Sequence, residues 1–190
     1  NIKKNIFTIK SMPNAIPYVT SYYKKFWGFS LDYNKLKKID KKKKYYFYIN
    51  SEFKNGSMNY GEYLIKGKSK KEILLCSYIC HPSMANNELS GPLVLSAIAK
   101  IIKPSFYSVR IILIPETIGA IAYINKNLKK LKKNLLAGFN LTCVGDQGNF
   151  SIIMSKEENT YADKIAKRNF KDAKLYTFLS RGSNERQFGC

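Results

Sequence analysis

From residue 72 onward, short apolar runs alternate with longer segments whose apolar residues recur at helical spacing. The apolar runs predict strands at residues 73–79, 109–114, 135–144, 150–154 and 175–179. The segments between them predict helices at residues 89–102, 118–133 and 160–170. Strands separated by helices of this length imply right-handed crossovers and helices on both faces of the sheet. We therefore expect an α/β fold with a mixed, largely parallel sheet sandwiched by helices.

The N-terminal third follows a different pattern, with aromatic, β-prone stretches between prolines, glycines and lysines. Residues 16–29 are strongly aromatic and predict strands or a cap that packs on another element. Residues 45–50 and a run ending at Ile65 flank an Asn-Gly turn and predict a hairpin. We therefore expect residues 1–66 to contain a small β-rich lobe and residues 67–190 to form the α/β domain, incomplete at its C-terminus.

The composition fits a folded domain without a membrane span. The chain has 190 residues, of which 45% are hydrophobic and 14% aromatic, enough to bury one core. Its apolar runs fall short of the roughly 18 to 20 residues that a membrane span needs, and nothing resembles a signal peptide. We expect a soluble, cytoplasmic protein, and, because the chain begins at Asn1 and ends at Cys190 within a polar segment, a fragment.

The net charge of +20 raises the question of a nucleic-acid partner. The charge comes from 29 lysines and only 4 arginines, and the lysines accompany many Asn, Ile, Tyr and Phe residues. Phosphate-binding surfaces favour arginine for its planar, forked guanidinium. A solvated lysine surface is therefore the favoured interpretation, and we expect no nucleic-acid partner.

The four cysteines form no CxxC pair. Two of them, Cys76 and Cys143, fall within predicted strands, and Cys80 directly follows one. Buried cysteine packs as a small hydrophobic side chain, so we expect structural free thiols.

Each of the first three predicted strands is followed by a residue that can bind a metal or transfer a proton. These residues are His81, Glu116 and Asp146. In a parallel sheet the carboxyl ends of the strands lie at one edge, so the three side chains can converge there. A histidine with carboxylates favours a catalytic zinc site, in which a carboxylate that is not a ligand acts as the general base.

Each of these residues also has a simpler interpretation. His81 is the only histidine in the chain, and a lone histidine often forms ordinary hydrogen bonds in a core or at a surface. Glu116 could favour the N-terminal end of the next helix, and Asp146 could form a turn. The coincidence at three strand ends favours the metal site over three separate structural roles.

Six segments carry a family resemblance and together cover nearly the whole chain. They read IPYVTSYYKKFWGF, GSMNYGEYLIKG, CSYICHPSMANNELSGP, IPETIGAIAYI, AGFNLTCVGD and RGSNERQF. In this order they resemble an aminopeptidase-like family that is often encoded beside bacterial surface-polysaccharide genes. That family is similar to the zinc aminopeptidases of clan MH, which implies a mixed sheet between helices with a small inserted β domain.

The resemblance assigns roles to single positions. His81 resembles the clan's first zinc ligand, and Asp146 resembles its later carboxylate ligand. Glu116 stands where the clan has its general base, which takes a proton from the attacking water. The clan's last histidine ligand would lie outside these 190 residues.

Two positions depart from the clan's pattern. The metal-bridging Asp falls at Asn87 with Glu88 beside it, so this carboxylate is either lost or displaced by one residue. Thr117 stands where the clan has a second Glu that binds the other metal. The resemblance therefore implies one zinc ion rather than two, held by His81 and Asp146 with help from Glu88 or Asn87.

The segment SRGSNERQF at the end of the chain follows the last predicted strand. Arg181 and Arg186 could bind a substrate carboxylate through the guanidinium fork, and Glu185 could bind a substrate amine. An internal salt bridge among these residues is the alternative. Relatives commonly have Asp where Asn184 stands.

Two functions follow from these features. The first is a zinc-dependent metallo-aminopeptidase that cleaves an amide next to the free amine of a small peptide or aminoacyl substrate. The second is a catalytically silent binding or accessory protein of surface-polysaccharide biosynthesis, which Asn87, Thr117 and Asn184 favour. The sequence leaves the oligomeric state open, although an aromatic β lobe offers a surface for a homo-oligomer contact.

Overall fold

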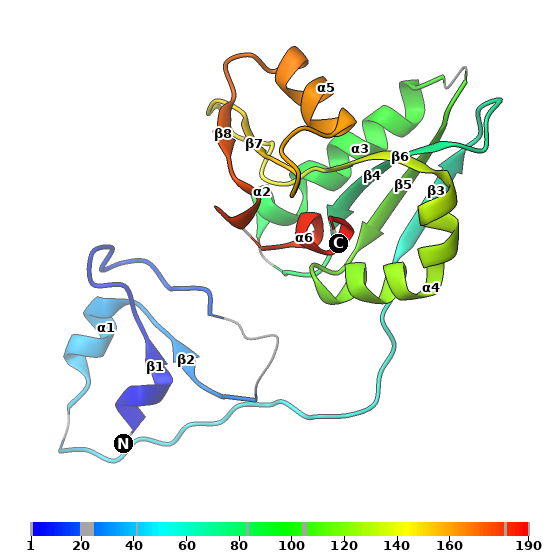
Figure 1. Cartoon of the computed structure of the whole chain (residues 1–190). Coiled ribbons are helices and arrows are strands. Elements are labelled where there is room, and N and C mark those ends of the chain that lie inside the picture. Colours follow the sequence, from blue (N-terminus) through cyan, green and yellow to red (C-terminus); the bar gives the residue numbers. More distant parts are fainter. Residues whose placement is uncertain are drawn as a thin grey trace. The chain divides into compact units, whose positions relative to one another are not determined.

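The computed structural model describes residues 2–19, 25–40, 42–82, 84–103, 106–180 and 182–189. The chain divides into two compact units, Asn1–Lys54 and Asn55–Cys190 (Figure 1). The observed division thus falls at residue 54, whereas the sequence patterns place the end of the N-terminal lobe at residue 66.

The first unit contains short elements held by aromatic contacts. The 3-10 helix η1 (Ile2–Asn5) leads into β1 (Ile6–Phe7), which pairs in parallel with β2 (Phe29–Ser30). Helix α1 (Tyr33–Lys38) begins after Asp32, whose carboxylate accepts the N–H of Lys35 as an N-cap. Both strands are two residues long, so β structure is a minor part of the described residues of this unit.

Residues 45–50 form no strand, and the predicted hairpin is wrong. Residues 44–60 form no helix or strand, and the side chains of Tyr46, Tyr48 and Phe53 are 89%, 71% and 81% exposed. Aromatic residues favour a strand only where a neighbouring strand pairs with it and one face is covered. Neither condition is met here, so the small lobe is not β-rich in its described part.

A four-stranded sheet forms the centre of the second unit, with the strand order β3-β5-β4-β6. β4 (Glu72–Tyr78) runs parallel to both of its neighbours, β5 (Ser108–Ile114) and β6 (Leu135–Asn140). β3 (Gly61–Ile65) runs antiparallel to β5 at the sheet edge. The sheet is therefore mixed and largely parallel, which confirms the fold class.

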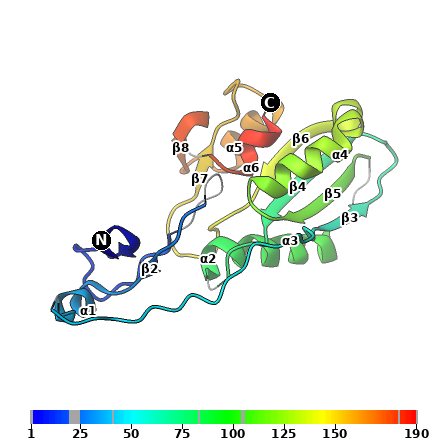
Figure 2. The same ribbon diagram turned by 90° about the horizontal axis from the view of Figure 1, so that it is seen from below.

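Helices α3 (Ser90–Ile101) and α4 (Ile118–Asn134) cover opposite faces of this sheet (Figure 2). Alternate residues of the central strands face different helices, as the pleat of a strand requires. One cluster joins Leu95 of α3 to Val109 and Ile111; the other joins Ala120, Tyr123 and Leu131 of α4 to Leu74, Cys76, Ile112 and Ile114. Both faces are buried, which explains why the strands are continuous apolar runs.

The last third of the chain adds small elements beside the sheet. β7 (Ser151–Ile153) and β8 (Lys174–Tyr176) pair in parallel, and α5 (Tyr161–Asn169) lies between them in sequence. The 3-10 helix η2 (Phe178–Ser180) precedes α6 (Asn184–Phe188), whose Phe188 packs against the core cluster beneath α4. None of the helices in the described residues is long and apolar enough to cross a bilayer.

Charged side chains of opposite sign pair within the sheet. Arg110 on β5 is 2% exposed and donates to Glu72 on β4, with 2.8 Å between Nη2 and Oε1. Nε of Arg110 also donates to Glu72, and its Nη1 donates to Glu62 on β3. The hydrogen bonds from Arg110 hold the pKa of Glu72 below its ordinary value. Arg110 therefore links three neighbouring strands through charge.

Candidate active site

The ends of β4 and β5 bring His81 and Glu116 into contact. Tyr78 and Ile114, the last residues of the two strands, are in register, and the N–H of Ile79 still donates to the carbonyl of Ile114 at 3.2 Å. The segments that follow therefore leave the sheet side by side. Nε2 of His81 lies 2.8 Å from Oε2 of Glu116, and the two side chains are only 10% and 15% exposed.

Glu88 is buried in the loop that follows His81. It ends the short helix α2 (Ala85–Glu88), and its Oε2 accepts the backbone N–H of Cys80 at 2.6 Å. Its other oxygen, Oε1, and the neighbouring Oδ1 of Asn87 are buried without a hydrogen-bond partner among the described residues. Buried oxygens without a donor are costly, so each of these two atoms would be stabilised by a cation or another donor.

Cys80, His81 and Glu88 form a cluster of metal-binding groups. Their sulfur, ring nitrogen and carboxylate oxygen atoms lie within 4.8 Å of one another. Ligand atoms each lie about 2.0–2.3 Å from a zinc ion, so a set of this size needs only small shifts to reach one ion. The three donor types are also those that zinc accepts. The residues present therefore fit a zinc ion.

Sequence reasoning missed Cys80, which was expected to be a purely structural thiol. Its Sγ accepts the backbone N–H of Glu116 at 3.1 Å, so it links the ends of β4 and β5. Burial raises the pKa of Cys80 to about 11, which keeps the thiol protonated near neutral pH when no metal is bound. The sequence feature that could have revealed this role of Cys80 is its position directly before His81 at the end of a strand.

Glu116 lies in a tight turn with an unusual backbone. Thr117 has φ 60° and ψ −68°, and the N–H of Ile118 donates to the carbonyl of Glu116 at 2.7 Å, which closes a γ-turn. The N–H of Thr117 donates to Oδ1 of Asn184 at 2.8 Å, and Asn184 is fully buried. The turn therefore depends on a residue that lies 67 positions away in the chain.

Asp146 lies in an exposed loop after β6, outside the cluster of Cys80, His81 and Glu88. Its Oδ2 accepts from Nδ2 of Asn86 at 2.8 Å. Asn86 belongs to α2, the helix that ends at Glu88. The loop after β6, which ends at Asn140 rather than at the predicted residue 144, thus contacts the same short helix, and Asp146 is linked to the loop of His81 without belonging to the cluster.

The C-terminal segment reaches the sheet edge through Glu185. The Glu185 carboxylate accepts from Nδ2 of Asn140, the last residue of β6, at 3.4 Å. Arg186 donates instead to the carbonyl of Leu179 at 2.9 Å, within its own segment. Arg181 lies outside the described residues. Among the described residues, Glu185 is thus the predicted substrate-binding residue that contacts the end of a sheet strand.

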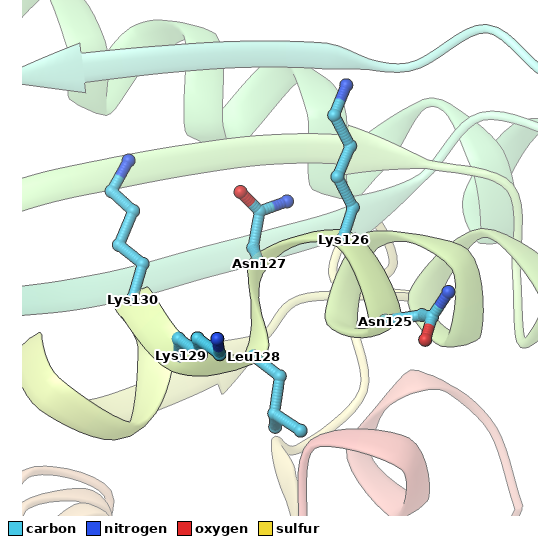
Figure 3. A pocket seen from close by; sticks show the side chains of 6 residues that line it. All are labelled: Asn125, Lys126, Asn127, Leu128, Lys129 and Lys130. Atoms are coloured by element: carbon cyan, nitrogen blue, oxygen red, sulfur yellow. The ribbon is translucent and has the colours of Figure 1, made fainter.

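A surface pocket lies on α4 and is lined by the six residues from Asn125 to Lys130 (Figure 3). Its first residue is about 10 Å along the helix from Ile118, at 1.5 Å per residue. The side chains diverge from one another, and none of them belongs to the predicted site (Figure 3). This surface is separate from the cluster at the strand ends.

The sheet and its helices define an α/β fold with a cluster of polar residues at the strand ends. The chain belongs to the family described as "Domain of unknown function (DUF4910)", which it matches over residues 11–190. It is 40% identical over 193 residues to a Clostridium acetobutylicum protein described as a "Putative polysaccharide biosynthesis protein with aminopeptidase-like domain". That match covers 98% of this chain and 44% of the relative.

A solved structure supports the same fold. The crystal structure of a "putative peptidase" from Clostridium acetobutylicum is similar, with a TM-score of 0.86 and 39% sequence identity. The similarity covers 98% of this chain and 45% of that one. The chain thus spans less than half the length of the relatives it matches.

Proposed function

We propose that the chain carries the metal-binding part of an aminopeptidase-like hydrolase. The observation that supports this most directly is the buried Glu88 carboxylate, which has one oxygen without a hydrogen-bond partner among the described residues. Glu88 lies in a cluster with His81 and Cys80, whose ligand atoms are close enough to share an ion. When bound, zinc supplies a Lewis acid and a water molecule of lowered pKa.

His81 and Glu88 are the central ligands of this proposal. Cys80 offers a third ligand from the cluster, and Asp146 is the carboxylate that the family resemblance assigns. Asn87 and Thr117 stand where the resemblance expects carboxylates for a second metal. We therefore propose one zinc ion.

Glu116 is the proposed general base. Its carboxylate is largely buried and contacts the His81 imidazole, so it is held beside the proposed metal ligand. In this role it takes a proton from water as the water attacks the substrate carbonyl, and it then returns a proton to the leaving amine. Glu185 of α6, which contacts Asn140 at the end of β6, is the proposed partner of the free amine of a small peptide or aminoacyl substrate.

A release assay tests this function. The protein is freed of metal with a chelator, resupplied with zinc, and incubated with a panel of aminoacyl amides. We expect release of the free amino acid with zinc and none after chelation. Absence of release from every substrate, in protein that binds zinc, would contradict the hydrolase.

The alternative is a binding or accessory protein of surface-polysaccharide biosynthesis that keeps the peptidase fold. One observation favours it: Asn87 and Thr117 provide an amide and a hydroxyl where the resemblance expects acids, and they stand directly beside Glu88 and Glu116 in sequence. The Clostridium acetobutylicum relative also carries polysaccharide biosynthesis in its description. Zinc binding without hydrolysis would favour this second function.

A further inference from the structure

The backbone that carries Glu116 is strained. Thr117 has a positive φ of 60°, a region that β-branched residues rarely adopt, and it is 4% exposed. Such a conformation persists only where surrounding groups hold it. The groups that hold this turn therefore determine the backbone position from which the Glu116 side chain extends.

Two consecutive N–H groups of the turn have different side-chain acceptors. The N–H of Glu116 donates to Sγ of Cys80 at 3.1 Å, and the N–H of Thr117 donates to Oδ1 of Asn184 at 2.8 Å. Cys80 belongs to the proposed metal cluster, whereas Asn184 is outside it. Asn184 therefore holds the turn from outside the proposed metal cluster.

The carboxamide of Asn184 is itself fixed by the core. It is 0% exposed, and its Nδ2 donates to Sγ of Cys76 on β4 at 3.4 Å. It begins α6, whose Phe188 packs against the core cluster beneath α4. One side chain therefore connects the body of the sheet to the turn after β5.

We propose that Asn184 is a positioning residue for the proposed base. Its carboxamide oxygen holds the strained turn in the conformation that brings Oε2 of Glu116 to 2.8 Å from Nε2 of His81. Without this acceptor the buried Thr117 N–H is left unpaired, and the turn relaxes toward negative φ. The inference rests on the proposed function only in naming Glu116 as the base. The contact between Glu116 and His81 is present whether or not the protein catalyses the reaction.

The unique histidine provides a readout of this contact that does not depend on activity. His81 is the only histidine in the chain, so the imidazole signals in an NMR spectrum belong to it alone. Spectra are recorded on the whole 190-residue chain with a chelator present. Glu116→Ala, which removes the carboxylate, calibrates the change that loss of the contact produces.

Asn184→Leu keeps the branching at Cγ and the number of side-chain heavy atoms but removes the acceptor. We expect it to move the His81 signals in the same direction as Glu116→Ala does. Thr117→Gly alone should leave them in place, because glycine adopts φ 60° without strain. The double variant Asn184→Leu, Thr117→Gly should return them toward the wild-type positions, a rescue that a merely structural role for Asn184 does not predict.

Folded Asn184→Leu protein with His81 signals at the wild-type positions would overturn the inference, as would signals that do not respond to Glu116→Ala. If Asn184→Leu does not fold, Asn184→Ser, which is too short to reach Thr117, replaces it. We then expect the same displacement of the His81 signals and the same return when Thr117→Gly is added. Absence of hydrolysis by the wild type would count against the proposed function, while the displaced signals would still support the role of Asn184.

Discussion

The carboxylate of Glu88 and the backbone N–H of Cys80 are joined by a 2.6 Å hydrogen bond across the loop between β4 and α3. This bond fixes Glu88 inside the loop that presents His81, and it uses only one of the two carboxylate oxygens. The other oxygen is buried without a hydrogen-bond partner among the described residues. The same side chain therefore shapes the loop and offers a ligand atom.

Glu116→Gln should lower hydrolysis of aminoacyl amides by about 10²- to 10⁴-fold, because an amide cannot accept the proton that the base takes. Gln has nearly the same shape, so zinc affinity should stay close to that of the wild type. Initial rates at saturating substrate and a zinc titration measure the two effects separately. Unchanged turnover would remove Glu116 from the role of base.

Arg110→Met should lower the free energy of unfolding by about 3–5 kcal/mol at pH 7, because it leaves a buried carboxylate without its cation. Glu72 is 6% exposed and loses its main donor in this variant. Urea unfolding measures the change, with Arg168→Met at an exposed position as the control. Equal stability losses in the two variants would contradict the role of the pair.

The same pair predicts a pH dependence. Arg110 lowers the pKa of Glu72 in the folded state, so the pair stabilises the fold fully above the ordinary carboxyl pKa. This stabilisation is lost as the pH falls from about 4.3 through the lowered pKa of the folded state. The stability difference between the wild type and Arg110→Met should therefore shrink in acid, and a difference that grows as the pH falls would contradict the assignment.

Gly91→Ala should destabilise the fold by about 1–3 kcal/mol, the usual range for overpacking. A methyl group at this position would overlap Oγ of Ser77 and the carbonyl oxygen of Leu141, which are joined by a 2.6 Å hydrogen bond. Gly138→Ala is the matched control, since the atom nearest to its new methyl group would be Cβ of Leu74, 3.8 Å away. Thermal unfolding of the two variants should show a lower midpoint for Gly91→Ala only.

The main elements of the second unit were predictable because hydrophobic periodicity sets them. The predicted strand at residues 109–114 and helix at 118–133 differ from β5 and α4 by one residue each. The contact of His81 with Glu116 also follows from sequence, since both residues come after neighbouring parallel strands. Local pattern and strand direction were sufficient for these features.

Features that depend on distant partners were not predictable. β3 was expected to pair within a hairpin, but it pairs with β5, where Tyr63 is in register with Ile111, because strand propensity does not specify a partner. The bond between Asn184 and Thr117 likewise joins segments 67 residues apart. The burial of Glu88 was not predictable either, because its position in the sequence of the loop does not show which group its carboxylate contacts.

Zinc binding by Glu88→Gln tests the central claim most directly. Gln can still accept the N–H of Cys80 but carries no charge, so the loop should keep its shape while the metal loses a ligand. Competition with a chromophoric chelator should show one zinc ion per chain for the wild type and for the exposed control Glu157→Gln, and at least about tenfold weaker binding for Glu88→Gln. Equal zinc affinity in Glu88→Gln and the wild type would contradict the account.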